Sequence, residues 1–157
     1  MKRKAISAFI SVAALTAAGV AAAPVASAAS PAAAPHAANG AYGCAGTAIN
    51  GGAPWLVKNS AGVTISDVYV YWNASTQKNC AVNVRTAAGG SGSFAGYLGI
   101  TIIDPGNTAN VDSDYGDYAS YAGPVSIVSP GCVSITAETQ PPSGAAVIRN
   151  INNIACG

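Results

Sequence analysis

Histidine and charge are scarce in this sequence, and their scarcity excludes several kinds of protein. The 157 residues include one histidine, His36, and only 8% of them are charged. Catalysis by Ser-His-Asp or Cys-His arrangements needs a histidine as base, and His36 lies in an Ala- and Pro-rich stretch that we expect to be a solvated tail. No CxxC pair is present, so the ligand spacing of a zinc site is missing.

The first 28 residues have the pattern of a secretory signal peptide. Residues 1–4 are positively charged, residues 5–23 are apolar and uncharged, and Ala26-Ser27-Ala28 is a small-residue cleavage site. This order of segments predicts export with cleavage after residue 28. Because the cleavage site follows the apolar run directly, we expect no retained transmembrane helix.

The segment that remains after cleavage is weakly acidic. Residues 29–41 are rich in Ala and Pro and predict a disordered tail, followed by a secreted domain at residues 42–157. Four Lys or Arg residues then stand against six Asp or Glu residues, so the formal net charge changes from +1 to −2. Four scattered cations do not make the basic patch that nucleic acids or anionic lipids attract. We therefore expect neither a nucleic-acid partner nor a membrane-embedded protein.

The secreted domain keeps all four cysteines, Cys44, Cys80, Cys132 and Cys156. An even number of cysteines in an exported protein predicts two disulfides, and four cysteines allow three connectivities. We expect the pairs Cys44–Cys156 and Cys80–Cys132, because a bond between the first and the last cysteine would join both chain ends to one body.

Short alternating segments between turn residues predict an all-β domain. The clearest is residues 63–73, where Val68 and Val70 point to one face and Tyr69 and Tyr71 to the other. Six to seven short strands at this spacing indicate an antiparallel β-sandwich or barrel. The expected strands are 55–58, 63–73, 80–86, 94–103, 125–129, 132–137 and 145–154, with Trp55 and Trp72 in the core and an irregular polar segment at 108–121.

Acidic residues are the candidates for catalysis or metal binding. Asp112, Asp114 and Asp117 cluster in the polar segment, and Glu138 is the only glutamate. Two carboxylates suffice for glycoside hydrolysis, and several carboxylate oxygens suit Ca²⁺. A catalytic acid needs a desolvating cleft, whereas this cluster is expected in a loop. We therefore expect solvated carboxylates, with no catalytic residue, metal or cofactor.

Tyrosines form the candidate binding surface of the domain. Tyr69 and Tyr71 share one strand face, and Tyr115, Tyr118 and Tyr121 fall within one short segment. Exposed together, these rings would stack on sugar rings. The alternative, which we favour, is that they pair across strands and cover the edge of the core, with each hydroxyl reaching water.

Several segments, in a fixed order around the cysteines, carry a family resemblance. They are Lys78–Arg85, Asp117–Val125, Pro130-Gly131-Cys132 and the terminal Cys156-Gly157. Together they resemble the spore-associated protein A family, small exported proteins of spore-forming filamentous actinomycetes. The resemblance implies an extracellular, surface-associated protein of unknown biochemical activity, and it carries over no catalytic residue.

Three hypotheses about function follow. The first is a non-enzymatic secreted protein associated with the surface of spores or aerial hyphae, with the spore or cell wall as its partner. The alternative is a secreted binding module or inhibitor that acts on a polysaccharide or a foreign hydrolase. The third, a carboxylate hydrolase, depends on two of the four acidic side chains facing one cleft at roughly 5–9.5 Å.

Overall fold

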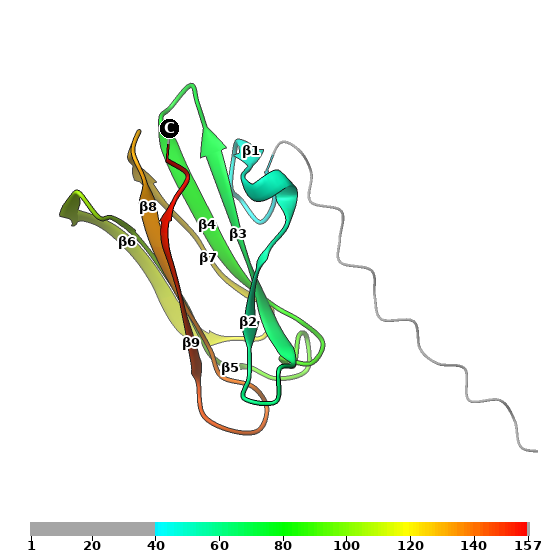
Figure 1. Ribbon diagram of the computed structural model, residues 1–157. Coiled ribbons are helices and arrows are strands. Elements are labelled where there is room, and N and C mark those ends of the chain that lie inside the picture. Colours follow the sequence, from blue (N-terminus) through cyan, green and yellow to red (C-terminus); the bar gives the residue numbers. More distant parts are fainter. Residues whose placement is uncertain (1–39, 157) are drawn as a thin grey trace, which may run out of the picture.

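The computed structural model describes residues 40–156, which form two facing β-sheets (Figure 1). The expected signal peptide lies outside the described residues, as does the expected tail up to residue 39. The elements are β1 (Thr47–Ala48), a 3-10 turn η1 (Asn50–Gly52), β2 (Trp55–Lys58), β3 (Thr64–Asn73), β4 (Lys78–Arg85), β5 (Gly96–Asp104), β6 (Asn107–Tyr118), β7 (Tyr121–Val128), β8 (Val133–Thr139) and β9 (Val147–Ile154).

Both sheets are antiparallel throughout. We call them sheet A, with strand order β1-β3-β4-β7 and β2 also paired to β3, and sheet B, with order β6-β5-β8-β9. The predicted all-β fold is confirmed, in its sandwich form. At one side of the sandwich the edge strands are β6 and β7, and at the other they are β2 and β9.

Strand β6 corrects the expectation of an irregular segment at 108–121. It pairs with β5 from Gly96 opposite Tyr118 as far as Asp104 opposite Asn107. The prediction was wrong because Asp, Asn and Gly are rare in strands, and this strand is rich in them. A turn between the two strands reverses the chain, and in it Asp104 Oδ1 accepts a hydrogen bond from the Gly106 N–H at 2.8 Å.

The apolar core lies between the sheets and follows from the alternation of each strand. Val68 and Val70 of β3 point into it, whereas Tyr69 and Tyr71 point away from it. Trp55 is half-buried against the core. The fully or nearly buried members are Val57, Ile65, Val68, Val70, Ala81, Leu98, Ile100, Ile102, Ala122, Val125, Ile127, Val133, Ile135, Ala137 and Ile151.

Strand β4 adds polar side chains to this interior. Asn83 is fully buried, and its Nδ2 donates to the carbonyls of Gly99 at 3.0 Å and Glu138 at 3.1 Å, as well as to Thr139 Oγ1 at 3.1 Å. Ser66 of β3, on the same sheet as Asn83, also bonds Thr139 Oγ1, at 2.7 Å. The amide nitrogen of Asn83 therefore ties sheet A to two strands of sheet B.

Arg85, at the end of β4, is buried and makes five hydrogen bonds to the backbone. It is 3% exposed, and its guanidinium lies 5.3 Å from the centre of the Phe94 ring. Burial lowers its pKa from the ordinary value, and the charge of Asp117 partly offsets that effect. Its nitrogens donate to five backbone carbonyls at 2.5–3.1 Å, those of Gly89, Gly96, Tyr97, Tyr118 and Gln140.

The disulfides are Cys44–Cys80 and Cys132–Cys156. The expectation of two disulfides is confirmed, but the expected pairs Cys44–Cys156 and Cys80–Cys132 are wrong. Each bond belongs to one sheet, because Cys80 lies on β4 of sheet A, whereas Cys132 and Cys156 flank the β8–β9 hairpin of sheet B. Cysteines that are neighbours in one layer satisfy the short Cα separation that a disulfide needs.

Candidate functional site

Tyr69 and Tyr71 lie beneath the N-terminal end of the described chain. They are 4% and 0% exposed and pack with both cysteines of the Cys44–Cys80 bond on the outer face of sheet A. Tyr42 stacks on Tyr69 with ring centres 6.3 Å apart, and its ring also lies 5.3 Å from that of Tyr121, at a tilt. The strand alternation places these side chains correctly, but the rings are covered rather than free to stack on a ligand.

This covered cluster predicts a loss of stability at alkaline pH. Burial, and secondarily the charge of Asp67, raises the pKa of Tyr69 far above its ordinary value, and burial also raises the pKa values of Tyr42 and Tyr71. Below about pH 10 the tyrosines are neutral in both the folded and the unfolded chain. Above it the unfolded chain releases these protons more readily than the folded chain, so the free energy of unfolding falls as the pH rises, with Tyr69 as the main contributor.

Urea unfolding between pH 8 and pH 11.5 tests that expectation. The free energy of unfolding should fall more steeply above pH 10 in the wild type than in Tyr69→Phe, because phenylalanine fills the same site and has no proton to release. Equal slopes for the two proteins would show that Tyr69 does not contribute to the alkaline loss.

Tyr115 lies on the other sheet, far from that cluster in the fold. It is 45% exposed on the outer face of sheet B and covers Gly99 of β5, where a Cβ would meet its ring at 2.3 Å. Its ring stacks beside that of Tyr97 with centres 6.3 Å apart, and its hydroxyl bonds Thr101. Pairing across strands was one part of the arrangement favoured from the sequence, but the ring covers Gly99 on the outer face instead of the edge of the core.

Tyr118 and Tyr121 do come together with an acidic residue. With Asp114 and Gly123 they line a hollow of about 400 Å³ where β6 passes into β7. The Tyr118 hydroxyl donates to Asp114 Oδ1 at 2.7 Å, and that bond raises the pKa of Tyr118. Of the five tyrosines in the candidate surface, these two share a hollow, Tyr115 stands apart, and Tyr69 and Tyr71 are buried.

The carboxylates of β6 bond the free edge of β7. Asp112 Oδ2 accepts from the Ser126 N–H at 2.8 Å, and Asp114 Oδ2 accepts from the Gly123 N–H at 2.6 Å. Two residues before them, Asn110 donates to the Val128 carbonyl at 2.8 Å. Alternate side chains of one edge strand thus pair with the backbone of the other, and we call this the β6–β7 seam. It covers an edge that would otherwise be open to another chain.

Asp114→Ala is expected to weaken the seam. The change removes the acceptors of the Gly123 N–H and the Tyr118 hydroxyl together, so the free energy of unfolding should fall by about 1–3 kcal/mol. Ser113→Ala, on the same strand but facing the opposite side of sheet B, is the matched control and should change it by less than about 0.5 kcal/mol. Chemical denaturation measures both. A loss in Asp114→Ala no larger than in the control would contradict the structural role.

The four acidic candidates are divided between the two faces of sheet B, since Asp112 and Asp114 lie opposite core residues of β5, whereas Asp117 and Glu138 lie opposite its outward-facing Tyr97 and Gly99. Asp112 and Asp114 belong to the seam, Asp117 is exposed near the end of β6, and Glu138 lies on β8 beside Tyr97, whose pKa its charge helps to raise. Within residues 40–156, no three His, Cys, Asp or Glu side chains gather closely enough to hold a metal ion.

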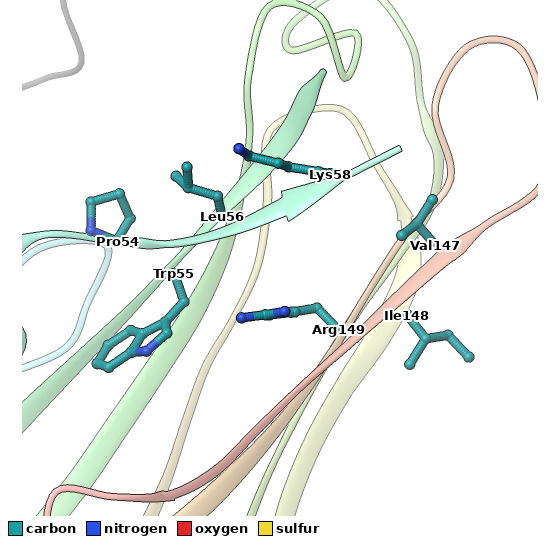
Figure 2. A pocket seen from close by; sticks show the side chains of 7 residues that line it. All are labelled: Pro54, Trp55, Leu56, Lys58, Val147, Ile148 and Arg149. Carbon is teal, nitrogen blue, oxygen red and sulfur yellow. The ribbon is translucent and has the colours of Figure 1, made fainter. Parts of the chain in front are cut away.

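The opposite side of the sandwich has an open cleft of about 500 Å³ between β2 and β9 (Figure 2). We call it the β2–β9 cleft. Trp55, Leu56 and Lys58 line it from sheet A, and Val147, Ile148 and Arg149 line it from sheet B. Figure 2 shows Arg149 extending from β9 toward the strand that carries Trp55. The volume lies within the range of small-molecule sites.

Sequence reasoning did not find this cleft. Its two walls are 89 residues or more apart in the chain, and Trp55 was expected in the core, where it lies only in part. The one available signal was that Lys58 and Arg149 fall within expected strands with no acidic residue nearby in the sequence.

Fold and site together define a disulfide-bonded β-sandwich with one bonded seam and one open cleft at its two sides. Over 89 aligned residues the chain is 34% identical to spore-associated protein A of Streptomyces coelicolor, an alignment that covers 52% of this chain and 51% of the relative. The chain therefore spans about half the length of the curated relative that it matches, and the similarity supports a relation to that family.

Other comparisons give no further assignment. No protein-family model matches the chain, and no solved structure matches it. Two disulfides are consistent with an extracellular or surface location. In residues 40–156 no helix has the length and apolar character needed to cross a membrane.

Proposed function

We propose that this protein is exported and associates with the outer surface of spores or aerial hyphae, where it acts by binding rather than by catalysis. The similarity to spore-associated protein A carries the proposal. The signal-peptide pattern of residues 1–28 supports export, and the two disulfides suit an oxidising compartment.

For two of the four acidic candidates, the geometry favours a structural role over hydrolysis. Glycoside hydrolysis needs two carboxylates free to act as acid and as base or nucleophile. Asp112 and Asp114 instead accept hydrogen bonds from the backbone of β7, and a carboxylate used in this way stabilises the fold.

A co-sedimentation assay tests the proposal. The exported protein, expressed from the full chain with its disulfides formed, is mixed with washed spores, vegetative walls, chitin and cellulose. We expect retention on spores and little on vegetative walls. Protein that stays in the supernatant in every mixture would contradict surface association.

A polysaccharide-binding module is the second candidate, favoured by the hollow that Tyr118 and Tyr121 line. Retention on chitin or cellulose would support it. Tyr121→Ala should then release the protein, whereas Tyr115→Ala, a change of the same kind on the far sheet, should leave retention unchanged. Equal effects of the two variants would argue against the hollow as the site.

A further inference from the structure

The two sides of the sandwich differ in the side chains that lie between their edge strands. At the β6–β7 seam, acidic and amide side chains bond the neighbouring strand edge. At the β2–β9 cleft the edge strands instead leave a hollow lined by an indole, aliphatic side chains and two cations. Ile148 and Leu56 at its rim are 60% and 41% exposed, so apolar surface remains in contact with water beside the charges.

Positive charge is concentrated at the cleft more than anywhere else on the described chain. Residues 40–156 contain four Lys or Arg residues, of which Arg85 is buried and Lys78 lies on another strand. The remaining two, Lys58 and Arg149, both line the cleft, and no carboxylate of the described residues lines it with them. In a domain with a formal net charge of −2, this is a local positive site.

We propose that the β2–β9 cleft binds an acidic carbohydrate, a pyranose ring that carries a carboxylate. This inference rests on the proposed function, because it names the chemistry on the cell or spore surface that the protein contacts. Arg149 would bond the carboxylate through its planar guanidinium, whose paired N–H groups match the two carboxylate oxygens. Lys58, on the opposite wall, would add a second positive charge for the next sugar unit.

Trp55 makes a sugar a better occupant than a simple anion. The indole is half-buried, so its position is fixed by the core while part of it lines the cleft. An aromatic face carries partial negative charge, which attracts the polarised C–H groups of a pyranose ring. A free phosphate ion would use the two cations and leave the indole and the aliphatic walls without a partner.

Binding of defined oligosaccharides to the exported protein tests the proposal. The probes are an oligogalacturonate, a neutral glucose oligomer of the same length and a glycerol phosphate polymer, measured by calorimetry at low and high salt. We expect binding of the oligogalacturonate, weakened by salt because ionic contacts are screened, and no binding of the neutral oligomer. Binding of the phosphate polymer alone, equal binding of the neutral oligomer, or no binding at all would overturn the proposal.

Charge-neutralising variants locate the site. Arg149→Gln is expected to weaken oligogalacturonate binding by about tenfold, which corresponds to one charge-assisted hydrogen-bonded contact. Lys58→Gln should weaken it by about threefold. Lys78→Gln makes the same change of net charge outside the cleft and should weaken it by less than about twofold. Equal losses in all three variants would show general electrostatic attraction and overturn the assignment to the cleft.

Fluorescence gives a readout that a structural role would not change. The chain has two tryptophans, Trp55 and Trp72, so in Trp72→Phe the emission comes from Trp55. Titration with oligogalacturonate should shift or quench that emission, and an unchanged spectrum at saturation would contradict contact with the indole.

Spore retention separates the cleft proposal from the surface-association proposal. If wild type and Arg149→Gln are retained equally, the cleft assignment fails alone, and if the wild type is not retained, the surface proposal fails.

Discussion

Replacing Arg85 by methionine is expected to lower the free energy of unfolding by about 3–5 kcal/mol. The guanidinium donates to five backbone carbonyls, which come from the segment after β4, the start of β5, the end of β6 and the loop after β8. One side chain thus holds four parts of the chain together at one end of the sandwich. Methionine fills similar space but donates nothing to those oxygens.

The size of this effect follows from what remains after the substitution. Substitution by apolar residues changes the free energy of unfolding little where both partners of a polar contact are replaced together. Here the carbonyls belong to the backbone and stay in place, so each loses its charge-assisted bond while it is still largely shielded from water. Since small domains are stable by only about 5–15 kcal/mol, the variant should lose a large share of its stability.

Urea unfolding of the oxidised protein measures the loss. Arg149→Met makes the same chemical change at an exposed side chain and should alter the free energy of unfolding by less than about 0.5 kcal/mol. Arg85→Lys keeps the charge but offers three donors to five acceptors, so it should fall between the wild type and Arg85→Met and stays measurable if methionine prevents folding. Losses at residue 85 no larger than at residue 149 would show that the carbonyl contacts contribute little.

Alternation predicted the strands well, because most of them have one apolar face. Strand β2 was predicted at its observed bounds, and in β3 the division between Val68 and Tyr69 corresponds to the core and the outer face. The alternation did not predict strand β6 because both of its faces are polar. One face is bonded to β7 and the other is exposed. The turn at Asp104-Pro105-Gly106-Asn107 was a usable signal, since a tight reversal after a strand favours a second strand beside it.

The candidate site was less predictable, since it depends on which segments are neighbours in space. Tyr69 and Tyr71 have the alternation of a surface pair, but residues 41–44 cover them, and nothing in the local sequence indicates that cover. Asp112 and Asp114 have the composition of a solvated turn, yet the register with β5 aligns them with the edge of β7. The β2–β9 cleft requires the same kind of knowledge, because its walls come from distant strands.

Removing the Cys44–Cys80 bond is the other change with a large expected effect. Cys44→Ala combined with Cys80→Ala should lower the free energy of unfolding by about 4 kcal/mol, the chain-entropy value for a loop of 36 residues. The bond also holds the N-terminal end of the described chain against the outer face of sheet A. Its loss should therefore expose the cluster around Tyr69 and Tyr71 as well as free the unfolded chain.

The second disulfide supplies a matched control for that cluster. Cys132→Ala combined with Cys156→Ala opens a loop of 24 residues, worth about 3.5 kcal/mol on the same basis. This bond lies in sheet B, so tyrosine exposure on sheet A should not change. Near-ultraviolet circular dichroism of the native state should then lose its tyrosine signal in the first double variant and keep it in the second.

Peptide mapping under non-reducing conditions checks the disulfide pairing on which both double variants depend. A cross-linked peptide that joins Cys44 to Cys156 would contradict the observed pairing, and with it the separate role of each bond. If the pairs are as observed, equal stability losses with unequal tyrosine signals would separate the two contributions of the Cys44–Cys80 bond. Loop closure acts on the unfolded chain and should be similar for both bonds, whereas cover of the aromatic cluster acts on the folded protein and belongs to one bond alone.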